Sequence, residues 1–241
     1  NAIGDRDVLH AAAETLEAGE SVEAMAGWAW THGITLVGGS ITERREGREK
    51  LSNTSIVFDP EGSIAGVYRK IHMFDVVVDG HEYRESATEE PGDEIALSRL
   101  ADGTELGLTV CYDLRFPELY RRLAVDGAAE LLVVPAAFML HTGRDHWEVL
   151  LRARAIENQV FVIAPGQGRG PGPEGDSYGN SMIVDPWGEV LARAPDRECF
   201  VAANLEFARQ DEVRDRLPSL ANRVAGAKRA VADQIVQLLE H

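Results

Sequence analysis

The stretch that most constrains the fold runs from Leu106 to Arg121 and reads Leu-Gly-Leu-Thr-Val-Cys-Tyr-Asp-Leu-Arg-Phe-Pro-Glu-Leu-Tyr-Arg. Its first five residues are apolar or β-branched apart from one glycine, which is typical of a short strand covered on both faces. Pro117 fits the first turn of a helix, where its missing N–H costs nothing. The sequence therefore predicts a buried strand, a tight bend at Cys111 and then a helix over residues 117–126.

A cysteine at such a bend can serve as a nucleophile. The bend exposes its side chain, and nearby free backbone N–H groups and the helix dipole favour a thiolate and a developing oxyanion. The alternative interpretation is a small buried side chain that closes the strand, because free cysteine is among the most buried residue types. This stretch alone leaves both interpretations open.

Composition limits the classes of function. The chain has 241 residues, 44% of them hydrophobic, and a formal net charge of −16, so its field repels nucleic acid and anionic membranes. No apolar run is long enough to span a bilayer, and the polar start gives no sign of a signal peptide. Cys111 and Cys199 are too far apart for a disulfide framework or a metal motif. We expect a cytoplasmic protein without bound metal.

Periodicity predicts alternating helices and strands, which indicates an α/β layered domain with mixed sheets. Residues 75–94 and the Gly/Pro-rich residues 166–179 show no period and are interpreted as loops. The expected helices are 8–31 (with a break near Gly19), 117–126, 145–158, 206–216 and an amphipathic terminal helix over 224–241. The expected strands are 34–41, 51–58, 63–68, 105–110, 130–135, 160–164, 181–184, 189–193 and 200–204.

A cysteine nucleophile needs a base, an oxyanion stabiliser and groups that orient them. Lys70, at the end of a predicted strand, is either a cation held near Cys111 or a solvated strand end, and His72 would point to the same side. Glu85 and Glu118 are either site carboxylates or members of surface ion pairs. Arg115 could clamp a carboxylate of the protein or of a substrate. His141 and His146 have no third partner nearby, which argues against a metal site.

Taken together, these stretches resemble the nitrilase superfamily of carbon–nitrogen hydrolases, and most closely its branch of omega-amidases and deaminated-glutathione amidases. The resemblance covers the chain from about residue 8 to residue 223. It is carried, in order, by residues 68–75, Glu85-Ser86, residues 91–93, 111–118, 146–159, 177–179 and 184–189.

The resemblance implies a four-layer α-β-β-α sandwich with two mixed sheets and a Glu-Lys-Cys triad that uses no metal or organic cofactor. Cys111 and Lys70 match two triad positions, and Glu85 matches a further catalytic glutamate that positions the lysine and the substrate amide. The backbone N–H of Tyr112 and the Lys70 ammonium would form the oxyanion site.

Two departures from the family accompany the resemblance. The family's general-base glutamate, with the first strands and helix, precedes the region matched here, so we expect a segment N-terminal to residue 1. Asn180 stands where the amidase branch often has histidine. We expect a hydrolase domain over residues 1–223 and a helical extension over 224–241.

The expected activity is hydrolysis of a small carboxylate-bearing amide through a Cys111 thioester, with release of ammonia. The residues expected to line the substrate pocket are Phe138, Met139, Thr142 and His146. N-carbamoyl amino-acid hydrolysis and nitrile hydrolysis are alternatives with the same triad, and a non-catalytic binding or scaffold protein is the alternative from another class. By resemblance we also expect a homodimer or a higher homo-oligomer.

Overall fold

The computed structural model describes residues 6–78, 80–168, 177–195 and 197–224. Its helices are α1 (Arg6–Ala11), α2 (Glu20–His32), α3 (Pro117–Val125), α4 (Leu140–Asn158) and α5 (Phe207–Arg216), with short 3-10 helices η1 (Glu85–Ala87) and η2 (Cys111–Arg115). Its strands are β1 (Leu36–Glu43), β2 (Ser52–Phe58), β3 (Ile64–Arg69), β4 (Asp75–Val78), β5 (His81–Arg84), β6 (Ala96–Arg99), β7 (Glu105–Leu108), β8 (Leu131–Val133), β9 (Phe161–Ala164), β10 (Met182–Val184) and β11 (Val190–Arg193).

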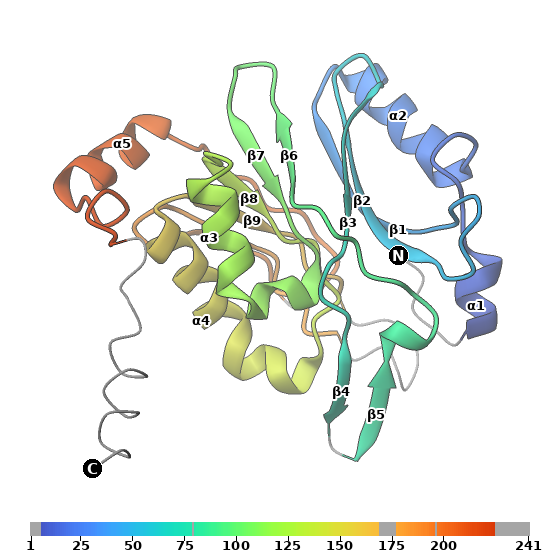
Figure 1. Cartoon of the computed structure of the whole chain (residues 1–241). Helices are drawn as coiled ribbons and strands as arrows, with labels where there is room; N and C mark the ends of the chain where they lie inside the picture. The colour runs from blue at the N-terminus through green and yellow to red at the C-terminus, as the bar shows by residue number, and fades with distance from the viewer. Residues whose placement is uncertain (1–5, 79, 169–176, 196, 225–241) are drawn as a thin grey trace, which may run out of the picture.

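The smaller of the two main sheets has the order β1-β2-β3 and is antiparallel throughout its described part. Side chains alternate along its central strand β2, as the period of two requires. Ile56 and Phe58 pack against α2, whereas Val57 joins the core on the other side. Figure 1 accordingly shows α2 lying along one face of this sheet.

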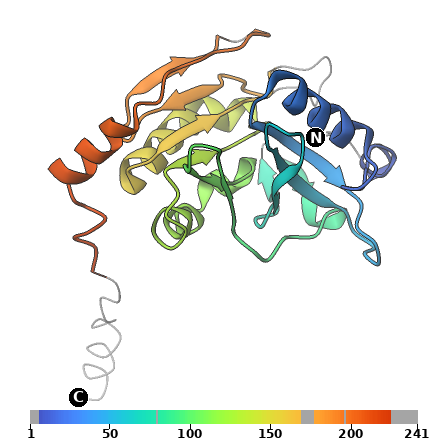
Figure 2. The ribbon, with the colours of Figure 1, turned by 90° about the horizontal axis from the view of Figure 1, so that it is seen from above.

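The larger sheet has the order β11-β10-β9-β8-β7-β6. Its central strands β7, β8 and β9 run parallel, and the outer pairs are antiparallel, so this sheet is mixed. The strand expected at 105–110 is thus confirmed as β7, next to the sheet's edge strand β6. Helices α3 and α4 cover one face, where Trp147 and Leu123 are fully buried (Figures 1 and 2).

The two sheets meet where β3 lies against β6. The Ser98 hydroxyl donates a hydrogen bond to the carbonyl of Ala65 at 3.4 Å, and a Cβ on Gly66 would lie only 3.0 Å from the Cβ of Ser98. This contact fixes β3 relative to β7. Lys70 directly follows β3, and β7 leads to Cys111. The α/β class with several sheets is therefore confirmed, and the packing brings two of the predicted site residues toward each other.

Four of the predicted segments need comment. The interpretation of residues 75–94 as an irregular loop is wrong, because β4 and β5 form a two-stranded hairpin there, with Val76 opposite Tyr83. The strand predicted at 200–204 is also wrong, because these residues form no strand and the Phe200 side chain is 92% exposed. The terminal helix, predicted over 224–241, and most of the Gly/Pro-rich loop lie outside the described residues.

No helix among the described residues has both the length and the apolar character needed to cross a bilayer. The cytoplasmic location stays a prediction.

Candidate functional site

Cys111 lies at the predicted bend, in a backbone conformation that is unusual for a residue with a side chain. Its φ is +50°, in the left-handed region. Its N–H donates to the carbonyl of Pro135 at 2.9 Å, and Sγ lies 3.9 Å from the carbonyl oxygen of Ala137. The bend continues into η2, and α3 begins only at Pro117. The dipole of α3 therefore does not start at Cys111, where the sequence had led us to expect it.

Asp113 holds this bend together and was missed as a site residue in the sequence analysis. Its fully buried carboxylate accepts hydrogen bonds from the Val110 N–H at 2.8 Å and from the Tyr68 hydroxyl at 2.8 Å. It also lies 2.7 Å from Nδ1 of His72, whose ring stacks on Phe116. Asp113 thus ties the nucleophile bend to the segment that follows β3. The only signal in the sequence was its place two residues after Cys111.

Lys70 and Glu85 form a buried ion pair, as the resemblance implied. Lys70 is 2% exposed, which rules out the alternative interpretation of a solvated strand end. Its ammonium donates to Oε1 of Glu85 at 2.7 Å and also contacts Oε2. The same carboxylate accepts from the Phe74 N–H at 2.5 Å and from Nδ2 of Asn53 at 3.3 Å. These donors fix the Glu85 side chain from three different segments.

The electrostatics of this cluster keep Lys70 and Glu85 charged. Burial alone would lower the pKa of Lys70, but the Glu85 carboxylate and the nearby Cys111 outweigh it and raise that pKa. Burial likewise opposes ionisation of Glu85, yet Lys70 and the other donors lower its pKa. The pKa of Cys111 is raised, because burial outweighs the attraction of Lys70. This direction favours a thiol in the resting protein, and the thiolate stays a prediction.

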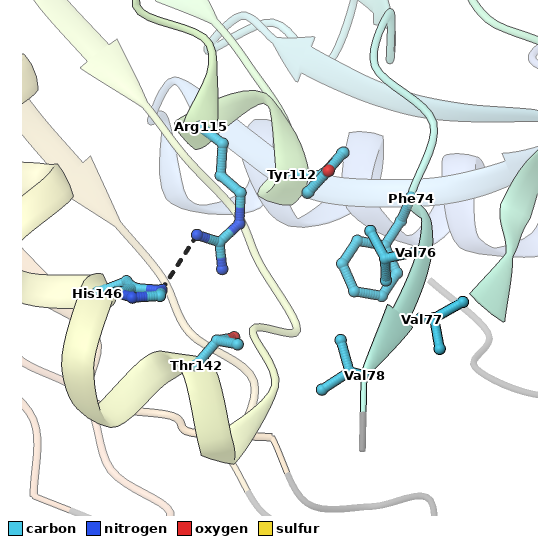
Figure 3. Close-up of a pocket in the computed structure, with 8 residues that line it drawn as sticks. All are labelled: Phe74, Val76, Val77, Val78, Tyr112, Arg115, Thr142 and His146. Carbon is cyan, nitrogen blue, oxygen red and sulfur yellow. Dashed lines mark hydrogen bonds between the residues drawn. The ribbon is translucent and has the colours of Figure 1, made fainter. Parts of the chain in front are cut away.

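A pocket of about 240 Å³ opens beside the bend. Figure 3 shows Arg115 and Tyr112 on one side and the β4 side chains on the other, with Thr142 and His146 contributed by α4. Its lining residues are Phe74, Val76, Val77, Val78, Tyr112, Arg115, Thr142 and His146.

The predicted pocket residues divide into two groups. Thr142 and His146 line the pocket, and Nδ1 of His146 lies 3.2 Å from Nη1 of Arg115. Phe138 lies beneath instead, with its ring centroid 4.9 Å from the Arg115 guanidinium carbon. Met139 precedes α4 and pairs with Ser177, outside the pocket lining.

Two residues of the supporting set also have defined places. The His72 ring is directed to Asp113 and not to Lys70. Glu118 is exposed in the first turn of α3, and no hydrogen bond or ion pair links it to the cluster in the part of the chain that the structure describes. Within the same ranges, no group of three or more His, Cys, Asp or Glu residues could hold a metal ion.

An α/β fold that places a cysteine at a strained bend beside a buried lysine–glutamate pair defines a class of proteins suited to nucleophilic cysteine chemistry. Residues 3–215 match the family of carbon-nitrogen hydrolases, and the chain belongs to that family.

Two curated relatives illustrate the branch. The deaminated glutathione amidase of Synechocystis sp. is 46% identical over 177 residues, which are 73% of this chain and 65% of that protein. The omega-amidase NIT2 of Homo sapiens is 41% identical over 201 residues, which are 83% of this chain and 71% of the relative. The chain thus spans about two thirds of the length of these proteins.

Solved structures agree with this assignment. Nit3 of Saccharomyces cerevisiae, a member of branch 10 of the nitrilase superfamily, superposes with a TM-score of 0.80 at 32% identity, covering 89% of this chain and 76% of the other. A mutant of the amidase from Nesterenkonia sp. AN1, which carries the acetamide moiety of fluoroacetamide on its active-site cysteine, gives 0.61 at 30% identity, covering 73% and 62%.

Proposed function

We propose that this protein is a cysteine amidase that hydrolyses small amides bearing a carboxylate. The observation that carries the proposal is the Lys70–Glu85 ion pair, buried and interacting with Cys111 at the strained bend. A fixed ammonium beside a nucleophile can stabilise the charge that develops on a carbonyl oxygen. The named amidases among the relatives, and the cysteine adduct in the Nesterenkonia amidase, support the same chemistry.

In the proposed reaction, Sγ of Cys111 attacks the amide carbon, and its proton passes to a general-base glutamate. The family resemblance implies this general-base glutamate. The Tyr112 N–H and the Lys70 ammonium hold the oxyanion of the tetrahedral intermediate. The C–N bond then breaks, and the proton leaves with ammonia. Water hydrolyses the resulting thioester to the carboxylic acid and restores the thiol.

Arg115 supports a carboxylate-bearing substrate. Its guanidinium faces the pocket, and no carboxylate of the described residues pairs with it. Burial lowers the pKa of Arg115, a direction that fits a half-buried cation without a carboxylate partner among the described residues. A substrate carboxylate could supply the missing partner through two parallel hydrogen bonds.

The test is replacement of the nucleophile. Cys111→Ala should lower ammonia release from dicarboxylate monoamides by about a thousandfold or more, because no other group can form the thioester. Cys199→Ala is the matched control, since that cysteine is exposed and distant in sequence, and it should leave the rate unchanged. Unchanged turnover in Cys111→Ala would refute the proposal.

A substrate panel distinguishes the proposed reaction from its alternatives. The panel should contain dicarboxylate monoamides, N-carbamoyl amino acids and nitriles, because all three could use the same cysteine. Preference for either of the last two would keep Cys111 as the nucleophile but change the substrate class. Absence of turnover across the panel would favour a non-catalytic binding or scaffold protein.

A further inference from the structure

Glu89 is a buried carboxyl group that the proposed chemistry does not yet use. It is 2% exposed, and its backbone pairs with Leu51 ahead of β2. Its Oε2 atom is buried without a hydrogen-bond partner among the described residues. Its backbone N–H donates to the carbonyl of Glu85 at 2.9 Å, which places the two side chains one helical turn apart on the same face. The buried Glu89 carboxyl group therefore neighbours the Glu85 carboxylate that holds Lys70.

The charges in this cluster do not balance if every acid is ionised. Lys70 supplies one positive charge, and its hydrogen bonds go to Glu85. A charged Glu89 would add a second buried carboxylate facing the first, with no cation of its own. Arg45 and Arg48 pair with the neighbouring Glu90 instead. Contacting carboxyl groups avoid this repulsion by sharing a proton.

We propose that Glu89 is a positioning residue, protonated in the resting protein, whose hydroxyl donates to the Glu85 carboxylate and holds it against Lys70. The inference rests on the proposed function in so far as Lys70 serves as the oxyanion group. The charged groups that face Glu89 in the described chain are Glu85 from η1 and Lys70 from the end of β3. Burial and then the neighbouring Glu85 raise the pKa of Glu89 to about 8, which agrees with this assignment.

The arrangement makes the site sensitive to alkaline pH. When Glu89 loses its proton, the cluster gains a negative charge, and Lys70 is attracted by two carboxylates. The ammonium is then less available to the oxyanion, and ionisation of Cys111 becomes harder. We expect activity to fall as the pH rises through the pKa of Glu89.

Two substitutions of Glu89 test its role as a hydrogen-bond donor separately from the effect of its ionisation. Glu89→Gln keeps a donor of the same shape and cannot ionise, so ammonia release at pH 7 should stay within about twofold of wild type and persist to higher pH. Glu89→Leu keeps a buried side chain without a donor, so kcat should fall about tenfold or more at every pH. Glu90→Gln is the matched control, because Glu90 pairs with Arg45, and it should keep the wild-type pH profile.

A second readout does not depend on turnover. The rate of Cys111 alkylation by iodoacetamide is measured against pH and resolved from Cys199 by peptide mass spectrometry. Glu89→Gln should lower the midpoint of this titration by about half a pH unit or more, because a negative neighbour is removed. Glu90→Gln should not shift it.

The outcomes distinguish the two proposals. An alkylation midpoint in Glu89→Gln equal to that of wild type overturns the role of Glu89, whatever the activity. Wild-type kcat in Glu89→Leu also overturns it. A shifted midpoint in a protein that releases no ammonia supports the coupling of Glu89 to Cys111 and overturns the amidase activity.

Discussion

Arg115 lies where the pocket meets the nucleophile bend, and its side chain illustrates how one residue can select a substrate. It extends from η2 over the Phe138 ring, so its direction is set before any ligand binds. The contact with His146 occupies one edge of the guanidinium (Figure 3). Other N–H groups of the five remain available to a ligand carboxylate.

Removal of this cation should weaken binding of charged substrates selectively. In Arg115→Met, we expect KM for a dicarboxylate monoamide to rise about tenfold to a hundredfold, because a charge-assisted hydrogen-bond pair is lost. KM for a neutral amide such as propionamide should change little. Steady-state kinetics on both substrates provide the measurement, and Arg115→Lys should recover part of the loss because it retains the charge. An equal rise in KM for both amides would contradict a carboxylate-binding role.

At the scale of elements, the position of Cys111 depends on how the residues that follow β7 are held in place. Thr109 and Cys111 are fixed by backbone hydrogen bonds to Val133 and Pro135, at the end of the neighbouring strand β8 and just beyond it. Arg154 of α4 donates to the carbonyl of Leu114 at 2.7 Å and so holds η2 from behind. The bend is therefore clamped on two sides by elements distant in sequence.

Close packing around β7 predicts the effect of one added methyl group. A Cβ on Gly107 would lie 2.6 Å from Cδ2 of the fully buried Leu132 and 3.3 Å from the Cβ atoms of Ala129 and Leu123. Gly107→Ala should lower the free energy of unfolding by about 1–3 kcal/mol, because these neighbours must move. Urea denaturation followed by fluorescence measures the change.

Gly27 of α2 provides the control for this substitution, since a Cβ there would meet nothing within 4 Å. Gly27→Ala should stabilise the protein by about 0.5–1 kcal/mol, because alanine favours the helix. A Gly107→Ala protein as stable as wild type would mean that α3 and β8 do not pack on β7 as described.

For the molecule as a whole, the buried cluster should make stability depend on pH in a defined direction. Burial and the neighbouring Glu85 raise the pKa of Glu89 to about 8 in the folded protein, whereas a glutamate in the unfolded chain has a pKa near 4.3. The folded state therefore binds more protons between these values, and the free energy of unfolding falls as the pH rises. Lys70 and Glu85 do not add to this fall, because their pKa shifts act above and below this range.

The Glu89→Gln protein isolates this contribution. Its stability should match that of wild type near pH 5 and exceed it by on the order of a few kcal/mol at pH 8. Urea denaturation of both proteins at pH 5, 6.5 and 8 supplies the comparison, in which contributions from the remaining charges cancel. A difference that stays constant with pH would show that Glu89 ionises normally in the folded state.

Association and location belong to the same scale and stay predictions. The expected homodimer, or higher homo-oligomer, would form through the face that carries the bend helix. The net charge of −16 on each chain still argues against nucleic acid and anionic membranes as partners.

The sequence by itself determined the local features of this protein. The strand, the bend at Cys111 and the helix after Pro117 follow from patterns within one short stretch, because period and turn chemistry are local properties. Lys70 and Glu85 were candidates among other residues, and the resemblance assigned them site roles, since their motifs keep a fixed order along the chain. The hairpin of β4 and β5 was not predicted, because short exposed strands lack the apolar alternation that indicates buried strands.

Only the tertiary structure decided which groups meet. Asp113 joins Tyr68 and His72 across 45 and 41 residues, and Lys70 meets Glu85 across 15 residues. Such contacts depend on how β3 packs against β6 and where the connecting segments cross, which no local pattern encodes. The same packing sets the burial of each group, and burial decides which of these acids keeps its proton.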